Sequence, residues 1–235
     1  MLLTKLREEV LEANLDLLRK GLVISTFGNV SGIAREEKRI VIKPSGLPYK
    51  RMKPADLVVT DLDGKVIEGK LRPSSDLATH VALYREFPSI GGVAHTHSEY
   101  ATAWAQARKP IPCFGTTHAD HFYGPVPVTE VMTENEVNGE YEANTGTVII
   151  RAFDGLDPAT MPAVLVANHG PFAWGSSPSK AAETAWILEV VARMAYFTLV
   201  INADTSSIGP VLRDRHFLRK HGKDAYYGQP GKKKK

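Results

Sequence analysis

The segment Gly91–Ser98 reads GGVAHTHS, and it says more about the fold than any other stretch of the chain. Its Gly-rich, apolar first part predicts a buried strand that ends at a site. Alternate side chains of a strand face the same way, so His95 and His97 would point toward one position. Two converging imidazoles are typical of a transition-metal site, most often zinc. The alternative is two unrelated surface histidines beside a turn, which further ligands would exclude.

Two more residues are candidate ligands. Asp76 follows the run PSS and opens an amphipathic segment, while His169 follows the apolar run 163–167. That run is short, β-branched and bounded by proline and glycine, so it predicts a buried strand with His169 in the loop after it. Three histidines and a carboxylate would make a four-ligand site. Taken alone, Asp76 is more typical of a helix cap, and His169 of a loop histidine before a turn.

Composition narrows the class of protein. Hydrophobic residues make up 43% and charged residues 23% of the 235, which are ordinary values for a globular chain. The formal charge is +3, and the terminal lysines 232–235 exceed that sum, so the charge gives no case for nucleic acid. A single cysteine, Cys113, allows no internal disulfide and fits a cytoplasmic protein. Early charges argue against a signal peptide, and no apolar run is expected to reach the ~20 residues of a membrane span.

Periodicity predicts alternating helices and strands. Helices are expected at 3–20, 75–87, 98–108, 179–200 and 210–221, and further strands at 40–42, 57–60, 65–67 and 148–150. The turn DLDG at 61–64 predicts a hairpin. This order indicates an α/β fold with three layers, in which a largely antiparallel sheet lies between helices. A single domain is expected over residues 1–229, followed by a basic, disordered tail at 230–235.

Several segments occur together in an order that resembles the class II aldolase/adducin family, and within it the L-ribulose-5-phosphate 4-epimerases. The similarity extends from Met1 to Gln229. The segments are TFGNVS (26–31), IKPSG (42–46), PSSD (73–76), HTHS (95–98), GTTHAD (115–120), ANHGPF (167–172), LRKHG (218–222) and AYYGQ (225–229). The family has the same architecture as the one expected above.

The resemblance implies a metal-dependent reaction on a sugar phosphate. Asp76, His95, His97 and His169 match the metal-ligand positions of the family, whose usual ion is Zn²⁺, with Mn²⁺ or Co²⁺ as possible substitutes. Such an ion acts as a Lewis acid beside a ketone and favours retro-aldol cleavage. No organic cofactor is needed for that chemistry.

Three small polar pairs and one lysine are candidate substrate ligands. Each pair offers backbone N–H groups or side-chain donors to an anion, although each alone is also typical of an ordinary turn. The resemblance implies that they line the substrate pocket together. The residues are Gly28, Asn29, Lys43, Ser45, Gly46, Ser74 and Ser75.

Asp120 and Tyr227 match the positions to which the family assigns proton transfer on the two faces of C4. Taken alone, the first is a loop aspartate and the second an ordinary tyrosine near the chain's end. The resemblance also implies a homotetramer whose active sites lie at subunit interfaces. Thr116, Glu142 and His216 are weaker candidates for supporting the site.

Three functions follow as hypotheses. The first is a cytoplasmic epimerase that interconverts L-ribulose 5-phosphate and D-xylulose 5-phosphate in L-arabinose or other pentose catabolism. The second is a class II sugar-phosphate aldolase of the L-fuculose-1-phosphate type. Asp76 favours the epimerase, because related aldolases usually carry glutamate there. The third is an adducin-like interaction module without catalysis, which should have lost metal ligands that this chain retains.

Overall fold

A seven-stranded sheet forms the centre of the computed structural model, which describes residues 1–228. The strand order is β4-β3-β2-β1-β5-β7-β6, and every neighbouring pair is antiparallel. The DLDG turn joins β3 to β4 as the sequence predicts. The strands are β1 (Asn29–Ala34), β2 (Arg39–Ile42), β3 (Val58–Asp61), β4 (Val66–Glu68), β5 (Gly92–His95), β6 (Ala163–Val166) and β7 (Gly170–Gly175).

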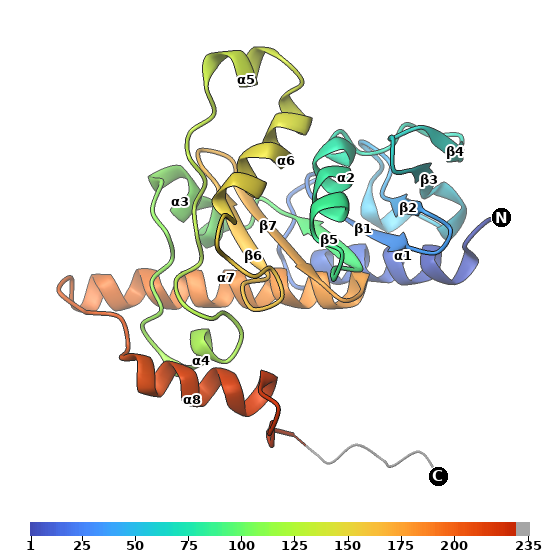
Figure 1. Ribbon diagram of the computed structural model, residues 1–235. Coiled ribbons are helices and arrows are strands. Elements are labelled where there is room, and N and C mark those ends of the chain that lie inside the picture. Colours follow the sequence, from blue (N-terminus) through green and yellow to red (C-terminus); the bar gives the residue numbers. More distant parts are fainter. Residues whose placement is uncertain (229–235) are drawn as a thin grey trace, which may run out of the picture.

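Helices cover both faces of the sheet, which confirms the expected three-layer α/β/α arrangement (Figure 1). One face carries α1 (Thr4–Arg19), α3 (Glu99–Ala107) and α7 (Pro178–Ile201), and the other carries α2 (Leu77–Glu86) and α6 (Tyr141–Ala152). The short helix α5 (Glu134–Asn138) packs on α6. Two 3₁₀ turns, η1 (Tyr49–Arg51) and η2 (Pro54–Asp56), lie between β2 and β3.

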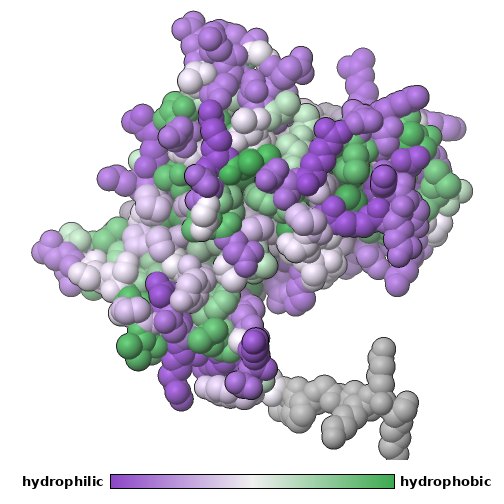
Figure 2. Space-filling model, in the orientation of Figure 1, coloured by the Kyte–Doolittle hydropathy of each residue, from purple (hydrophilic) through white to green (hydrophobic). Residues whose placement is uncertain are grey.

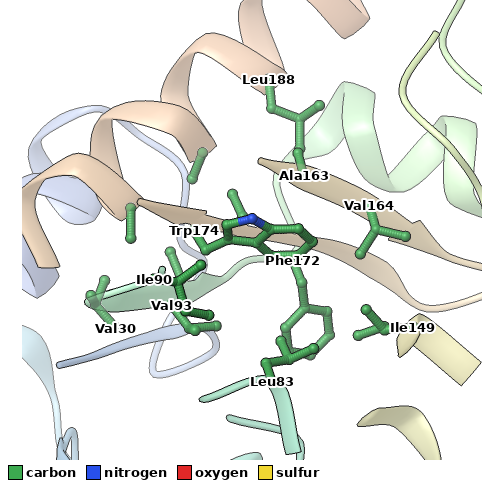
Figure 3. Close-up of a cluster of buried hydrophobic side chains, with 14 of the residues drawn as sticks. Val30, Leu83, Ile90, Val93, Ile149, Ala163, Val164, Phe172, Trp174 and Leu188 are labelled. Atoms are coloured by element: carbon green, nitrogen blue, oxygen red, sulfur yellow. The ribbon is translucent and has the colours of Figure 1, made fainter. Parts of the chain in front are cut away.

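The main hydrophobic core fills the space on both faces of β5, β6 and β7 (Figure 3). Phe172 and Trp174 of β7 are fully buried at its centre. Leu188 of α7 reaches this core from one face of the sheet, while Leu83 of α2 and Ile149 of α6 reach it from the other. Burial of such large side chains contributes about 1.5–3 kcal/mol each, so this core fixes the part of the sheet that carries His95.

The predicted strand at 148–150 is wrong, because these residues lie inside α6. The β-branched run alone favoured a strand, but the buried positions Thr145, Val148 and Ile149 recur at helical spacing along one face. Gly146 on that face lets α6 approach α2 closely, since a Cβ there would lie 2.6 Å from the Cβ of Ala82. Tertiary packing thus decides between two readings that the local sequence leaves open.

The chain leaves the layered body after α7. By length and composition alone α7 is apolar enough to cross a membrane, which corrects the expectation that no apolar run is that long. It packs along β5, β7 and α1 through its buried residues, but only 28% of its most apolar stretch is buried in the described structure. The last helix α8 (Pro210–His221) contacts α4 (Thr116–Ala119) beyond α7 (Figure 1). The predicted tail 230–235 lies outside the described residues.

Candidate active site

The sheet register sets the geometry of the site. Asn29 at the start of β1 pairs with His95 at the end of β5, and His95 in turn pairs with Phe172 of β7. The His95 imidazole stacks on the Phe172 ring, with centroids 4.2 Å apart and an interplanar angle of 18°. Because Phe172 is buried in the core, its ring holds the His95 imidazole in a fixed orientation.

Three imidazoles converge at this end of the sheet. His97 lies two residues beyond His95, and His169 lies in the turn between β6 and β7, as predicted. The Nε2 atoms of His95 and His97 are 3.1 Å apart, and the potential ligand atoms of all three side chains lie within 4.8 Å of one another. The turn that delivers His169 places Asn168 in the left-handed region, at φ 62°. Asparagine tolerates this conformation better than most residues.

The surroundings of the histidines fit a divalent metal ion. Nδ1 of His95 lies 3.0 Å from the carbonyl oxygen of Pro171, so it carries the proton and leaves the Nε2 lone pair free. Nδ1 of His169 lies 3.4 Å from the hydroxyl of Tyr141. Burial lowers the pKa of His97 and, helped by the neighbouring imidazoles, lowers the pKa of His169 to about 4. Neutral imidazoles with free nitrogens are the form that metals bind.

Asp76 lines the same pocket as the histidines. Its carboxylate is not among the clustered ligand atoms, which come from His95, His97 and His169. It occupies the N-cap position of α2, yet its side chain makes no capping hydrogen bond, so the alternative of a simple helix cap is wrong. Instead Oδ2 accepts a hydrogen bond of 2.5 Å from Nδ2 of Asn29. Burial alone would raise the pKa of Asp76, but the nearby imidazoles of His95 and His80 and the hydrogen bond from Asn29 outweigh it and lower the pKa.

Two loops meet above the metal-ligand candidates. An antiparallel bridge joins Pro44 to Pro73, and the backbone N–H groups of Ser45 and Ser74 donate to the carbonyls of Arg72 and Lys43 at 3.0 Å. The pocket bounded by these loops has a volume of about 380 Å³. All the substrate-binding and metal candidates line it, namely Gly28, Asn29, Lys43, Ser45, Gly46, Ser74, Ser75, Asp76, His95, His97 and His169.

Lys43 and Gly28 have strong local constraints. The Lys43 side chain is buried, its Nζ donates to the carbonyl of Thr26 at 3.1 Å, and burial lowers its pKa to about 8 against the opposing effect of Asp76. Gly28 has φ 81°, and a Cβ there would lie 3.0 Å from the carbonyl oxygen of His95. A side chain at this position would therefore clash with the strand that carries the histidine.

The pocket also contains residues that the sequence did not single out. Tyr141 at the first turn of α6 lines it beside Glu142, which was only a weak candidate, and Thr26 and Phe27 complete the wall. No motif marks Tyr141, because its place depends on how α6 packs against α2. The only available signal was a tyrosine next to Glu142.

Asp120 and Tyr227 are not brought to this pocket within one chain. Arg219 of α8 binds Asp120 through Nε to Oδ1 at 3.0 Å and Nη2 to Oδ2 at 2.7 Å, and Nδ1 of His216 lies 3.1 Å from Oδ1. Burial would raise the pKa of Asp120, but these partners and Lys220 lower it. The ring of Tyr227 lies 4.9 Å from the Arg219 guanidinium and is 61% exposed. Both residues therefore gather at α8, together with Asp120's neighbour Thr116 on α4.

The family model of the class II aldolase and adducin N-terminal domain matches residues 8–196. The chain belongs to this family. Among curated relatives of this class II aldolase/adducin member, the L-ribulose-5-phosphate 4-epimerase UlaF of Salmonella paratyphi A is 55% identical over 225 residues. That alignment covers 96% of this chain and 99% of the relative. UlaF of Salmonella paratyphi C is 54% identical over the same share of each chain.

Solved structures of family members share the fold. An L-fuculose 1-phosphate aldolase superposes with a TM-score of 0.79 at 25% identity, covering 92% of this chain and 96% of the aldolase. YgbL of Klebsiella pneumoniae, described as a putative aldolase/epimerase/decarboxylase, superposes with a TM-score of 0.71 at 28% identity, covering 90% and 97%. Members of the family are typically dependent on a divalent metal, and the three-histidine cluster of this chain can hold one.

Proposed function

We propose that this chain, as a single domain over residues 1–229, is a metal-dependent L-ribulose-5-phosphate 4-epimerase that interconverts L-ribulose 5-phosphate and D-xylulose 5-phosphate. One observation carries the proposal: a single pocket contains three converging imidazoles and every phosphate-type donor that the family motifs predict. The identity of 55% to curated epimerases over nearly the whole chain supports the same substrate. The likeness to an aldolase structure, at 25% identity, supports a shared bond-breaking step.

The reaction needs more than proton abstraction, because C4 of the substrate carries no acidic hydrogen. Removing the proton of the C4 hydroxyl breaks the C3–C4 bond and gives glycolaldehyde phosphate and a three-carbon enediolate. The aldehyde then turns its other face, C3 attacks it, and the new C4 oxygen takes up a proton, so no atom is lost. A divalent ion, which we infer to be Zn²⁺, would supply Lewis acidity for this cleavage and be held by His95, His97, His169 and Asp76.

The two loops around the pocket would bind the phosphate. The side-chain hydroxyls of Ser45, Ser74 and Ser75 and the backbone N–H groups of Gly46 and Ser75 suit an anion without blocking its approach, whereas the N–H groups of Ser45 and Ser74 are used between the loops. Lys43 adds a charge from the pocket wall. The phosphate would then stay bound while the aldehyde carbon turns, and this anchoring favours recombination over release of the aldehyde.

Asp120 and Tyr227 are our candidates for proton transfer on the two faces of C4. In one chain they lie with α8, beyond α7 from the sheet (Figure 1). They would reach the pocket of a second copy, so we infer a homotetramer with its active sites at subunit interfaces. Exposed apolar side chains on α7 and α8 support an assembly: Ile201 and Val211 are each 84% exposed. Hydrophobic surface also gathers around α8 (Figure 2).

A coupled assay tests the proposal. Purified protein should convert L-ribulose 5-phosphate to D-xylulose 5-phosphate and release little free glycolaldehyde phosphate. Prolonged chelation should abolish turnover, and Zn²⁺, Mn²⁺ or Co²⁺ should restore it. Full activity in metal-free protein would overturn the metal-dependent mechanism, and accumulation of free aldehyde with little inversion would favour the aldolase.

We infer a cytoplasmic role in L-arabinose or related pentose catabolism.

A further inference from the structure

A buried chain of three hydrogen-bonding side chains lies directly beneath the site. His80 and Tyr84 are on α2, one and two turns beyond Asp76, and Ser31 is on β1. Ser31 Oγ lies 2.7 Å from Nδ1 of His80 and 2.8 Å from the hydroxyl of Tyr84. All three side chains are 0% exposed. None of them lines the pocket, and the reaction described above does not use them.

The direction of the protons in this chain follows from the partners at its far end. Ser31 is the only side chain within hydrogen-bond distance of the Tyr84 hydroxyl among residues 1–228. A buried hydroxyl proton needs an acceptor, so Tyr84 donates to Ser31. Ser31 in turn donates to Nδ1 of His80. His80 therefore carries its own proton on Nε2.

The Nε2–H of His80 is left without a partner in the described part of the chain, although it is buried. A buried donor without a partner costs about 1–3 kcal/mol, so such a group usually donates a hydrogen bond to a ligand or to a neighbouring residue. The ring lies edge-on to Phe172, with centroids 6.1 Å apart, and Phe172 is the ring on which His95 stacks. The free N–H thus belongs to the floor of the metal centre.

The Asp76 carboxylate offers an acceptor one helical turn before His80. Residues four apart on a helix share one face, and helical side chains point back toward the N-terminus, so the His80 ring lies beside the Asp76 side chain. Oδ2 of Asp76 is bound by Asn29, whereas Oδ1 accepts no hydrogen bond from any residue described by the structure. The free donor of His80 and the Asp76 carboxylate therefore lie one helical turn apart on the same side of α2.

We propose that Tyr84, Ser31 and His80 form a hydrogen-bond relay that keeps His80 in the Nε2–H form, and that this N–H positions the Asp76 carboxylate in the metal centre. His80 is then a positioning residue that acts through Asp76. The proposed effect of His80 on Asp76 rests on the proposed function, because it requires a metal centre. The proposed Nε2–H form of His80 does not rest on it. Outer partners of metal ligands typically affect metal affinity by about 10–100-fold when they are replaced.

The first test uses the wild-type protein without metal. Nitrogen-15 NMR of the histidine side chains should show His80 neutral, with the proton on Nε2 and none on Nδ1. Comparison with Ser31→Ala and Tyr84→Phe assigns the His80 signal. Both variants break the relay, so the Nδ1–H form of His80 should appear in them. A wild-type His80 with its proton on Nδ1 would overturn the relay, whatever the metal does.

The second test measures Co²⁺ binding by its visible absorption. His80→Asn keeps a group near Ser31 but removes the donor at the Nε2 position, whereas His80→Gln places an amide there. We expect His80→Asn to weaken Co²⁺ binding by about 10–100-fold and to change the spectrum, and His80→Gln to restore most of both. His118→Asn, at a buried histidine that bonds to the Gly124 carbonyl, should lower stability but leave the Co²⁺ spectrum unchanged.

The outcomes separate the two proposals. If wild-type protein does not bind Co²⁺, the metal centre of the proposed function fails, while NMR still decides the relay. If wild type binds Co²⁺ and His80→Asn binds it equally well with the same spectrum, the positioning role is wrong. Should His80→Asn fail to fold, Ser31→Ala decides instead, because it keeps the imidazole and is expected to weaken Co²⁺ binding.

Discussion

Arg219 binds both carboxylate oxygens of Asp120, with Nε 3.0 Å from Oδ1 and Nη2 2.7 Å from Oδ2. The two residues are 99 positions apart and join α8 to the end of α4. A carboxylate held in this bidentate way stays ionised, which agrees with the lowered pKa of Asp120. In the proposed reaction it is therefore poised to accept the proton of the C4 hydroxyl from one of the two epimers.

Replacing Arg219 should change the pH dependence of epimerisation. Without the guanidinium the pKa of Asp120 rises, so Arg219→Met should move the acid limb of kcat to higher pH, while Arg219→Lys should move it less. Asp120→Asn should lose about 10²–10⁴-fold in kcat at every pH, the usual worth of a general base. Metal content should not change in any of these variants. An acid limb that stays in place in Arg219→Met would remove Asp120 from the proton-transfer step.

The start of α3 offers a second prediction, because this helix begins two residues after His97. Glu189 of α7 accepts hydrogen bonds from the backbone N–H groups of Tyr100 at 2.8 Å and Ala101 at 2.9 Å. Glu189→Ala would leave these donors unpaired and should reduce the free energy of unfolding by about 1–3 kcal/mol. Because α3 then frays next to His97, metal affinity should fall as well.

Glu183→Ala is the matched control on the same helix. Glu183 pairs with Lys180 in an exposed ion pair, so its removal should change stability by no more than about 1 kcal/mol and leave metal affinity intact. Urea unfolding and Co²⁺ titration measure the two effects. Equal behaviour of the two variants would show that Glu189 does not brace the site.

Much of this fold was predictable because the sequence carries local signals. The helix at 210–221 begins at Pro210 and stops before Gly222, as its residues indicate. The short run at 148–150 misled the interpretation, since three β-branched residues fit a strand or a buried helix face equally well. The packing of α6 on α2, where Gly146 lies close to Ala82, decides for the helix, and it joins two segments distant in sequence.

The site was also predictable where its residues belong to short local motifs. The histidines and small polar loops follow from short motifs, and they line a common pocket. Tyr141 was missed because no pattern around it refers to the pocket that α6 reaches only through its packing on α2. The relay from Tyr84 to His80 was missed for a similar reason, since its middle member, Ser31, comes from a strand about 50 residues earlier.

The contact between α6 and α2 gives a third prediction. Gly146→Ala would place a Cβ 2.6 Å from that of Ala82, so overpacking should lower the free energy of unfolding by about 1–3 kcal/mol. It should also raise KM, because α6 carries Tyr141. Adding Ala82→Gly should recover both losses. Gly209→Ala, where a Cβ meets nothing within 4 Å, should leave KM unchanged and cost only the modest loss of a favourable N-cap residue of α8. A double variant no better than Gly146→Ala would contradict this account of the contact.

The pKa of Lys43 gives the last prediction, which concerns the basic limb of kcat/KM. Burial lowers this pKa to about 8, and sugar phosphates are already dianions above pH ~7. Lys43 is charged below pH 8 and neutral above it, so kcat/KM should fall as the pH rises through about 8. Lys43→Met should lose about 10–100-fold at pH 7 and show no such limb, because its binding has no charge to lose. Lys43→Arg stays charged, so its profile should be flat through pH 8. A basic limb of the same shape in Lys43→Met would assign it to another group.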